Sequence, residues 1–215
     1  MPLLPVITYA DDIHLYRWAM PGDRPRGAAR AAEREAETLL IHSVFGSAAA
    51  LEHTPDGAPY VVGEAGSTIC PAGHISISHT RGIVCMAVGE RKIIGVDVER
   101  VTERTIKVRR KFLSAEELTQ IAEDDPIANT IAWTAKEAAY KAALTPGLSL
   151  SDGIRLLNPT TGEHAGRSEH HGYFEWQGYF ECHGSKVPLT FITAITDNLV
   201  VTLALPSDHH QGRFY

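Results

Sequence analysis

Two carboxylates stand two residues apart at the end of an apolar stretch, residues 93 to 99 (Ile-Ile-Gly-Val-Asp-Val-Glu). Successive side chains of a β-strand point to opposite faces, so Asp97 and Glu99 share one face while Val96 and Val98 share the other. A buried carboxylate without a partner costs on the order of several kcal/mol. The pair must therefore be solvated, paired with Lys or Arg, or bound to a metal, and alone it is most typical of a strand that ends in solvent.

A second group of polar residues lies upstream, in Ser76-Ile77-Ser78-His79. In a strand the two serines face one side, and Ile77 and His79 face the other. By itself His79 is most simply explained as a core histidine whose hydrogen bonds are satisfied.

The third group lies on a helix expected from about residue 126 or 127 to residue 144, before Pro146-Gly147. Trp133, Glu137 and Lys141 are spaced by four and share one helical face. Alone, Glu137 and Lys141 would form an ion pair between successive turns that stabilises a surface helix by about 0.2–0.5 kcal/mol. Trp133 is expected to pack and to orient the helix.

The composition is that of a globular protein of one large domain or two smaller units, with 215 residues, 44% hydrophobic and 21% charged. The net charge of -6 argues against nucleic-acid binding, although a local basic patch is formed by Arg24, Arg26, Arg30 and Arg34. Three scattered cysteines suggest neither a disulfide framework nor a zinc site. The chain lacks a signal-peptide pattern and a membrane-length apolar run, so we expect a cytoplasmic protein without a membrane partner.

The remaining pattern predicts an α+β fold with one substantial helix and several antiparallel strands in each half. A helix is expected at residues 27 to 45, and Ser114 with Glu117 forms a capping box that begins a short helix. The polar residues 89 to 92 predict a hairpin between residues 82–88 and 93–99. Further strands are expected within residues 3–20, 61–62, 75–79, 154–157, 173–182, 189–195 and 199–205. The halves are expected to be residues 1–99 and 100–215, with a boundary near residues 99 to 110.

In this order and at this spacing, the three groups resemble those of the 4'-phosphopantetheinyl transferases, in their larger single-chain, surfactin-synthetase-activating class. That class activates fatty-acid, polyketide and peptide synthases. Residues 110 to 114 (Arg-Lys-Phe-Leu-Ser) look like the family's Arg/Lys-Phe-Phe/Leu-Ser segment, and residues 56 to 60 (Asp-Gly-Ala-Pro-Tyr) look like its Gly-Lys-Pro turn. The likeness runs from about residue 55 to residue 144, and the flanks agree only in length and expected elements.

The resemblance implies a monomer built as a pseudo-dimer of two similar subdomains, each a helix packed on an antiparallel sheet, with coenzyme A bound between them. The family's three acidic magnesium ligands correspond by position to Asp97, Glu99 and Glu137, of which Asp97 would also contact the coenzyme. Its pyrophosphate lysine corresponds to Lys141, and its contact near the 3'-phosphate to His79 with Ser78. Magnesium prefers hard oxygen ligands and leaves positions for phosphate, which these carboxylates allow.

The implied reaction is attack of a serine of an acyl or peptidyl carrier protein on the β-phosphate of coenzyme A, with release of 3',5'-ADP. Magnesium and Lys141 would neutralise the pyrophosphate. Glu137 would act as the base, directly or through a metal-bound water. Lys136 would either contact phosphate or be solvated.

Two positions depart from the family pattern. Ala58 stands where the turn often has a lysine, and Thr38 stands where many relatives have an arginine. Binding of the 3'-phosphate would then rest on His79 and on the basic patch, with Arg30 as its candidate residue.

A coenzyme-A-binding member of the fold with weak or no transfer stays open as an alternative, and a plain structural α+β domain would require the three groups to coincide by chance. Fatty-acid, polyketide and peptide-synthase carriers all stay open, because carrier choice resides in surface loops.

Overall fold

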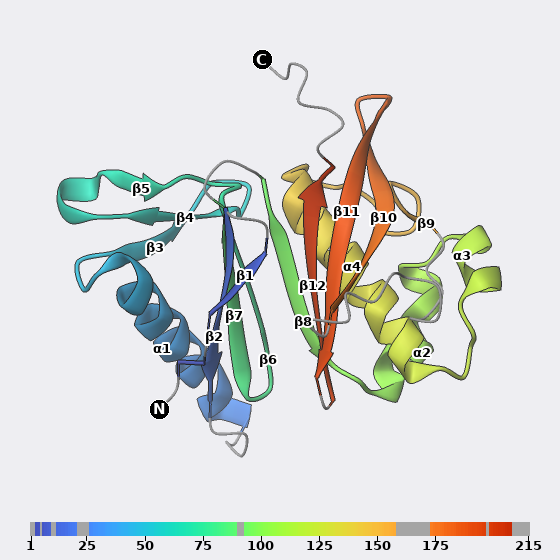
Figure 1. Cartoon of the computed structure of the whole chain (residues 1–215), viewed down its shortest axis with the longest axis horizontal. Coiled ribbons are helices and arrows are strands. Elements are labelled where there is room, and N and C mark those ends of the chain that lie inside the picture. The colour runs from blue at the N-terminus through green and yellow to red at the C-terminus, as the bar shows by residue number, and fades with distance from the viewer. Residues whose placement is uncertain are drawn as a thin grey trace.

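The computed structural model describes residues 3–4, 6–9, 12–20, 26–89, 93–157, 173–196 and 198–207, without the side chains of residues 26 to 28. These residues form two halves that lie side by side, each with one long helix against an antiparallel sheet (Figure 1). The expected α+β class is confirmed. The similarity of the two halves, as a pseudo-dimer, stays a prediction.

The N-terminal half contains a four-stranded sheet in the order β1-β2-β7-β6 and a three-stranded sheet in the order β3-β4-β5. Helix α1 (Arg26–Phe45) covers the larger sheet because Leu40 and Ile41 pack with Val84 and Met86. The strands are β1 (Ile7–Tyr9), β2 (Ile13–Ala19), β3 (Ala50–His53), β4 (Pro59–Val62), β5 (Thr68–Cys70), β6 (Ile75–Thr80) and β7 (Ile83–Gly89), with a short 3-10 turn η1 (Glu64–Gly66).

The C-terminal half contains a five-stranded antiparallel sheet in the order β8-β12-β11-β10-β9, with helix α4 packed on it (Figure 1). Its strands are β8 (Gly95–Arg100), β9 (Ile154–Leu157), β10 (Tyr173–Cys182), β11 (Ser185–Thr196) and β12 (Leu199–Pro206). Its helices are α2 (Glu103–Val108), the 3-10 turn η2 (Arg109–Lys111), α3 (Ala115–Gln120) and α4 (Pro126–Ala143).

Helices α3 and α4 begin at the capping residues that the sequence offers. Ser114 and Glu117 make both hydrogen bonds of the capping box at the start of α3. Asp125 caps α4 by accepting from two backbone N–H groups, and the helix ends at Leu144 in the left-handed conformation (φ 47°). Helix α2 was not expected, because six residues capped by Thr102 are too few for a clear apolar period.

The expected hairpin between residues 82–88 and 93–99 does not form, and this prediction is wrong. Strand β7 pairs with β2 and β6, whereas β8 pairs with β12. Residues 90 to 92 of the expected loop lie outside the described part of the chain. Because β8 belongs to the C-terminal sheet, the division between the two sheets falls between β7 and β8 rather than after residue 99.

A shared apolar core joins the two halves. Val96 and Val98 of β8 are buried against Leu15 and Cys85 of the N-terminal sheet. The valine face of β8 is therefore buried between the sheets, as the alternation predicted.

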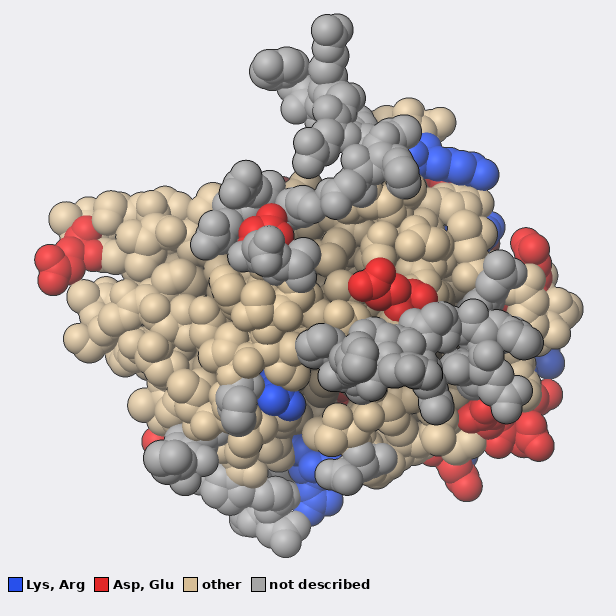
Figure 2. All heavy atoms as spheres, viewed as in Figure 1, with Lys and Arg blue, Asp and Glu red and all other residues tan. Residues whose placement is uncertain are grey.

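The face shown in Figure 2 carries Lys and Arg side chains near its lower middle, where the two halves meet, and a gathering of Asp and Glu side chains at its lower right. In the described part of the chain, every helix is too short or too polar to cross a membrane.

Candidate active site

Hydroxyl side chains of β6 bridge the two halves. Ser76 Oγ accepts the backbone N–H of Val96 at 2.9 Å, and Ser78 Oγ accepts that of Val98 at 3.3 Å. These serines thus satisfy the edge of β8 that faces away from its sheet. The Ser78 hydroxyl also donates to Asp97 Oδ1 at 2.7 Å. Ser78 is buried and holds the Asp97 carboxylate in place, while its expected contact with coenzyme A stays a prediction.

Gly95 lets β8 approach α4 closely. A Cβ atom at this position would lie 1.8 Å from the backbone oxygen of Ala138. No side chain fits there, so only glycine permits this separation between the strand that carries Asp97 and Glu99 and the helix that carries Glu137.

Asp97 forms an ion pair with Lys141 from α4. The Lys141 ammonium lies 2.9 Å from Asp97 Oδ1 and also donates to the backbone oxygen of Val96 at 2.9 Å. Asp97 is only 6% exposed, so the pair neutralises a carboxylate that has lost most of its water. Lys141 therefore pairs with a strand of the sheet, β8.

Asp97, Glu99 and Glu137 are called the acidic trio, and negative charge within it raises the pKa of both glutamates. Burial raises the pKa of Glu137, the charges of Asp97 and Glu99 raise it further, and Lys141 opposes the shift. Burial and the Asp97 charge likewise raise the pKa of Glu99, against hydrogen bonds from Thr80 and Trp133. The trio thus concentrates negative charge that a cation would relieve.

The chemistry of the acidic trio fits a magnesium ion. Its donors are hard carboxylate oxygens, and Asp97 Oδ2 is buried without a hydrogen-bond partner in the described structure. Within the described ranges, no three His, Cys, Asp or Glu side chains are already gathered at metal-binding spacing. The Lys141 ammonium provides the compensating charge on Asp97 in this conformation.

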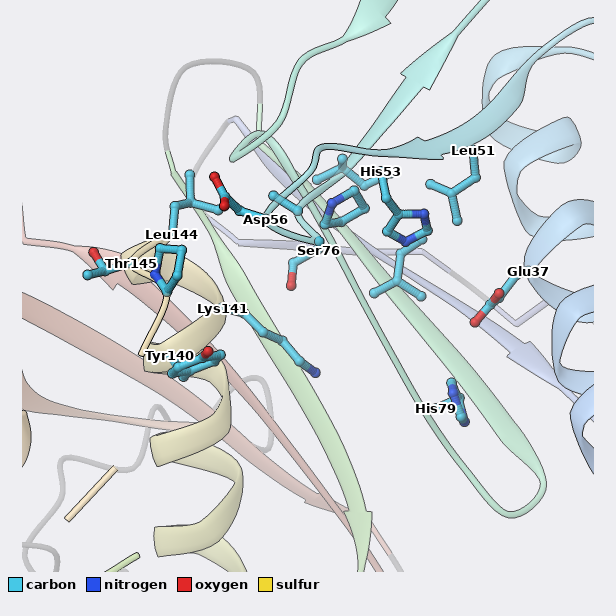
Figure 3. A pocket seen from close by; sticks show the side chains of 16 residues that line it. Glu37, Leu51, His53, Asp56, Ser76, His79, Tyr140, Lys141, Leu144 and Thr145 are labelled. Carbon is cyan, nitrogen blue, oxygen red and sulfur yellow. The ribbon is translucent and has the colours of Figure 1, made fainter. Parts of the chain in front are cut away.

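A cleft of about 280 Å³ opens between the two halves beside Lys141 (Figure 3). We call it the first cleft. Lys141 and Tyr140 reach it from α4, Glu37 from α1, and Ser76 and His79 from β6. Its remaining lining is Leu51, His53, Asp56, Gly57, Ala58, Pro59, Ile75, Ile77, Leu144, Thr145 and Pro146.

His79 is not a core histidine. Its side chain is 43% exposed, and Nδ1 lies 3.7 Å from Glu33 Oε1 on α1. Arg30 is exposed on the same helix but does not line the first cleft. Arg24 and the side chain of Arg26 lie outside the described residues. The structure thus brings His79 and Lys141 to one cleft, and the role expected of Arg30 stays a prediction.

Lys136 requires a correction. Its side chain is 0% exposed, and Nζ lies 2.8 Å from Glu117 Oε2 while donating to the backbone oxygens of Leu150 and Ile154. Burial lowers its pKa to about 8, although Glu117 opposes this shift. The ammonium is thus fully engaged inside the C-terminal half, so neither the expected phosphate contact nor the expected solvated state is found. Lys136 lies four residues after the buried Ala132, on a buried side of α4.

A second cleft, of about 230 Å³, lies beside Glu99 and was missed by sequence reasoning. Its lining comes from the end of β8, from α2 and its cap Thr102, from η2, from α4 and from the loop after α4. The residues are Glu99, Arg100, Thr102, Arg104, Thr105, Val108, Lys111, Trp133 and Leu150. The sequence did not predict a site at this cleft, because helix α2, which supplies much of the lining, was not expected.

Comparisons with known proteins point to one family. The chain is 33% identical over 120 residues to a 4'-phosphopantetheinyl transferase of Bacillus subtilis, a match that covers 52% of this chain and 51% of that protein. The match thus spans about half the length of that relative. A family model described as the 4'-phosphopantetheinyl transferase superfamily matches residues 93–203, just over half of the chain, and includes the whole acidic trio and Lys141. The chain therefore belongs to the 4'-phosphopantetheinyl transferase superfamily.

Proposed function

We propose that this protein transfers the 4'-phosphopantetheine arm of coenzyme A to a serine of an acyl or peptidyl carrier protein, in a magnesium-dependent reaction in the cytoplasm, as a monomer. The observation that carries the proposal is the ion pair between Asp97 and Lys141, the latter of which lines the first cleft. The charges of this pair and of Glu99 act on the ionisation of Glu137. Membership of the superfamily and the name of the Bacillus subtilis relative support the same activity.

The reaction forms a bond between the carrier serine oxygen and the β-phosphorus of coenzyme A. The bond from that phosphorus to the bridging oxygen breaks, and 3',5'-ADP leaves with the electron pair. Phosphoryl transfer of this kind needs mainly positioning and charge stabilisation. Lys141 supplies a compact positive charge at the edge of the first cleft, where it would stabilise the charge that develops on the leaving group.

Glu137 is the proposed acceptor of the serine proton. Burial raises its pKa, which brings the carboxylate closer to the strength that suits a base near neutral pH. Asp97, Glu99 and Glu137 would hold magnesium, which when bound neutralises the pyrophosphate charge. His79 would bind the 3'-phosphate from the other side of the first cleft, where Glu33 now faces its ring.

A second candidate function is coenzyme A binding without efficient transfer. The first cleft is lined by Glu37 and Asp56, and Ala58 occupies the position where the family turn often has a lysine. The two carboxylates repel a polyanionic ligand such as coenzyme A, and the missing lysine no longer offsets this repulsion.

Intact-mass spectrometry distinguishes the two candidates. Apo carriers of the fatty-acid, polyketide and peptide-synthase types would each be incubated with the protein, coenzyme A and magnesium. Transfer adds the mass of one phosphopantetheine arm to at least one carrier. Binding of coenzyme A in calorimetry with no mass gain on any of the three would favour the binding function.

A further inference from the structure

Two sheet edges meet at the boundary between the halves. Strand β6 ends the larger N-terminal sheet, strand β8 ends the C-terminal sheet, and the two strands lie side by side (Figure 1). Hydroxyl groups of β6 join the edges, because Ser76 accepts the N–H of Val96. Two residues further on, Ser78 accepts the N–H of Val98. Both bonds join residues that are 20 apart in the sequence, so the strands run in the same direction in a fixed register.

This register also gives each acid of β8 its own hydroxyl donor. Ser78 donates to Asp97 Oδ1 at 2.7 Å, and Thr80 donates to Glu99 Oε2 at 3.3 Å. Each of these bonds joins residues that are 19 apart. Because side chains two residues apart on a strand share a face, the two donors repeat with the same period as the two acids. The hydroxyl face of β6 thus matches the acidic face of β8.

Glu99 has competing partners on its other side. It lines the second cleft together with Arg100 and Arg104, and that lining includes neither Asp97 nor Glu137. A glutamate has a long side chain with many rotamers, so a guanidinium can draw its carboxylate away unless a fixed donor holds it. Thr80 is such a donor, because branching at Cβ restricts the first torsion of its side chain.

We propose that Thr80 is a positioning residue of the magnesium site, whose hydroxyl holds the Glu99 carboxylate on the face of β8 that it shares with Asp97. This inference rests on the proposed magnesium-dependent function. Thr80 lines neither cleft, so it acts through Glu99 and not by contact with coenzyme A. Loss of a hydrogen bond that orients a metal ligand typically lowers metal affinity about 10- to 100-fold. A residue of the N-terminal half thus orients a ligand that belongs to the C-terminal sheet.

Removal of the hydroxyl tests this role in the full-length protein. Thr80→Val keeps the shape of the side chain and removes the donor, whereas Thr80→Ser keeps the donor. Thr119→Val is the matched control, because Thr119 is an exposed threonine of α3 whose hydroxyl donates to the backbone oxygen of Glu116. The Tm of each protein would be measured across a magnesium titration at constant ionic strength, without coenzyme A or carrier.

Thr80→Val should need about tenfold more magnesium than the parent for the same rise in Tm. Thr80→Ser and Thr119→Val should stay within about twofold of the parent, because both keep the donor to Glu99. An unchanged magnesium requirement in Thr80→Val overturns the proposal, as does a parent whose Tm does not respond to magnesium. A defect in Thr80→Ser as large as that in Thr80→Val would assign the loss to packing and also overturns it.

The transfer reaction gives a separate readout. Thr80→Val should raise the magnesium concentration for half-maximal rate about tenfold, while the KM for coenzyme A at saturating magnesium stays within about twofold of the parent value. A raised KM for coenzyme A with an unchanged magnesium requirement would place Thr80 in coenzyme binding and reject the positioning role.

Manganese binding separates this proposal from the transferase proposal. Electron paramagnetic resonance of free manganese, titrated with each protein, gives a Kd that depends neither on the stability of the variant nor on transfer. A Kd raised about tenfold in Thr80→Val alone supports the positioning role, even where no arm is transferred to any carrier. Equal manganese Kd values for the parent and Thr80→Val, or no binding to the parent, reject it, whatever the parent does in the transfer reaction.

Discussion

The ammonium of Lys141 lies 2.9 Å from Oδ1 of the buried Asp97, across the boundary between helix α4 and strand β8. Spacing along the helix had suggested only a surface ion pair with Glu137. The observed pair instead joins the helix that carries one member of the acidic trio to the strand that carries the other two. It places a positive charge at the edge of the first cleft.

Replacement of Lys141 separates a role in the reaction from a role in the helix. Lys141→Ala should lower kcat by at least about a hundredfold, as does removal of one preorganised charge-stabilising group in other enzymes. Lys141→Arg should recover part of this, because a planar guanidinium replaces a compact ammonium. The measurement is kcat at saturating coenzyme A, with the Tm of each variant as a folding control and Lys107→Ala as a matched surface change. Parental kcat in Lys141→Ala would refute the role.

Magnesium should bind through Asp97. Because a ligand that binds only the folded state stabilises it, the Tm of the parent should rise with magnesium concentration. Asp97→Asn should lose this rise, whereas Glu116→Gln, which alters an exposed carboxylate on α3, should keep it. Thermal unfolding across a magnesium titration checks this. A rise of equal size in Asp97→Asn would remove Asp97 from the metal site.

Glu137→Gln should stabilise the protein near neutral pH while lowering activity. Burial raises the pKa of Glu137 in the folded state, so the folded protein holds this proton more tightly than the unfolded chain does. The stability that this group contributes is present at low pH and is lost as pH rises through the raised pKa. The gain should appear as a Tm above that of the parent at pH 7. The gain should vanish as the pH falls well below the ordinary pKa of a glutamate, where Glu137 is protonated in both states, and a gain that persists there would contradict the cause given.

Lys136 and Glu117 should matter for stability and not for coenzyme binding. Removal of one partner leaves the other charge buried, so Glu117→Gln and Lys136→Met should each cost about 3–5 kcal/mol. The double variant should lose much less than the sum, because both charges are gone. Urea unfolding gives these values. A raised KM for coenzyme A in a folded Lys136→Met protein would restore the phosphate role that the structure does not support.

His79 should bind the 3'-phosphate of coenzyme A. His79→Ala should raise the KM for coenzyme A about ten- to a hundredfold, the cost of a charge-assisted hydrogen bond of roughly 1.5–3 kcal/mol. Dephospho-coenzyme A lacks that phosphate, so parent and variant should use it about equally. A defect of the same size with dephospho-coenzyme A would place His79 in the reaction instead.

Local sequence patterns correctly predicted features that depend on neighbouring residues, such as a helix start and the two faces of a strand. The capping box of Ser114 and Glu117 begins α3, and the alternation of Val96 with Asp97 set the two faces of β8 correctly. The pairing of β8 with its neighbouring strand is a contact between residues far apart in the sequence. Residues 95 to 100 pair with β12, about a hundred residues later, and no local pattern distinguishes that from a hairpin with β7.

The site followed the same division. The motifs predicted a site at Asp97, Glu99, Glu137 and Lys141, and that site stays a prediction. The observed pairing of Lys141 with Asp97 depends on how closely α4 approaches β8 over Gly95. Lys136 was misplaced because its partner, Glu117, is distant in sequence and was explained fully by its role in the capping box. In the structure, one Glu117 carboxylate serves the helix cap, the Lys136 ammonium and the backbone of Leu156 together.

A single-turnover experiment tests the central claim most directly. Parent and Asp97→Asn proteins would be mixed with limiting coenzyme A, excess apo carrier and magnesium, and both 3',5'-ADP and modified carrier would be quantified. The account predicts equal amounts of the two products with the parent, and neither product when magnesium is chelated or Asp97 is replaced. Carrier modification at the parental rate by Asp97→Asn, or 3',5'-ADP released without modified carrier, would contradict it.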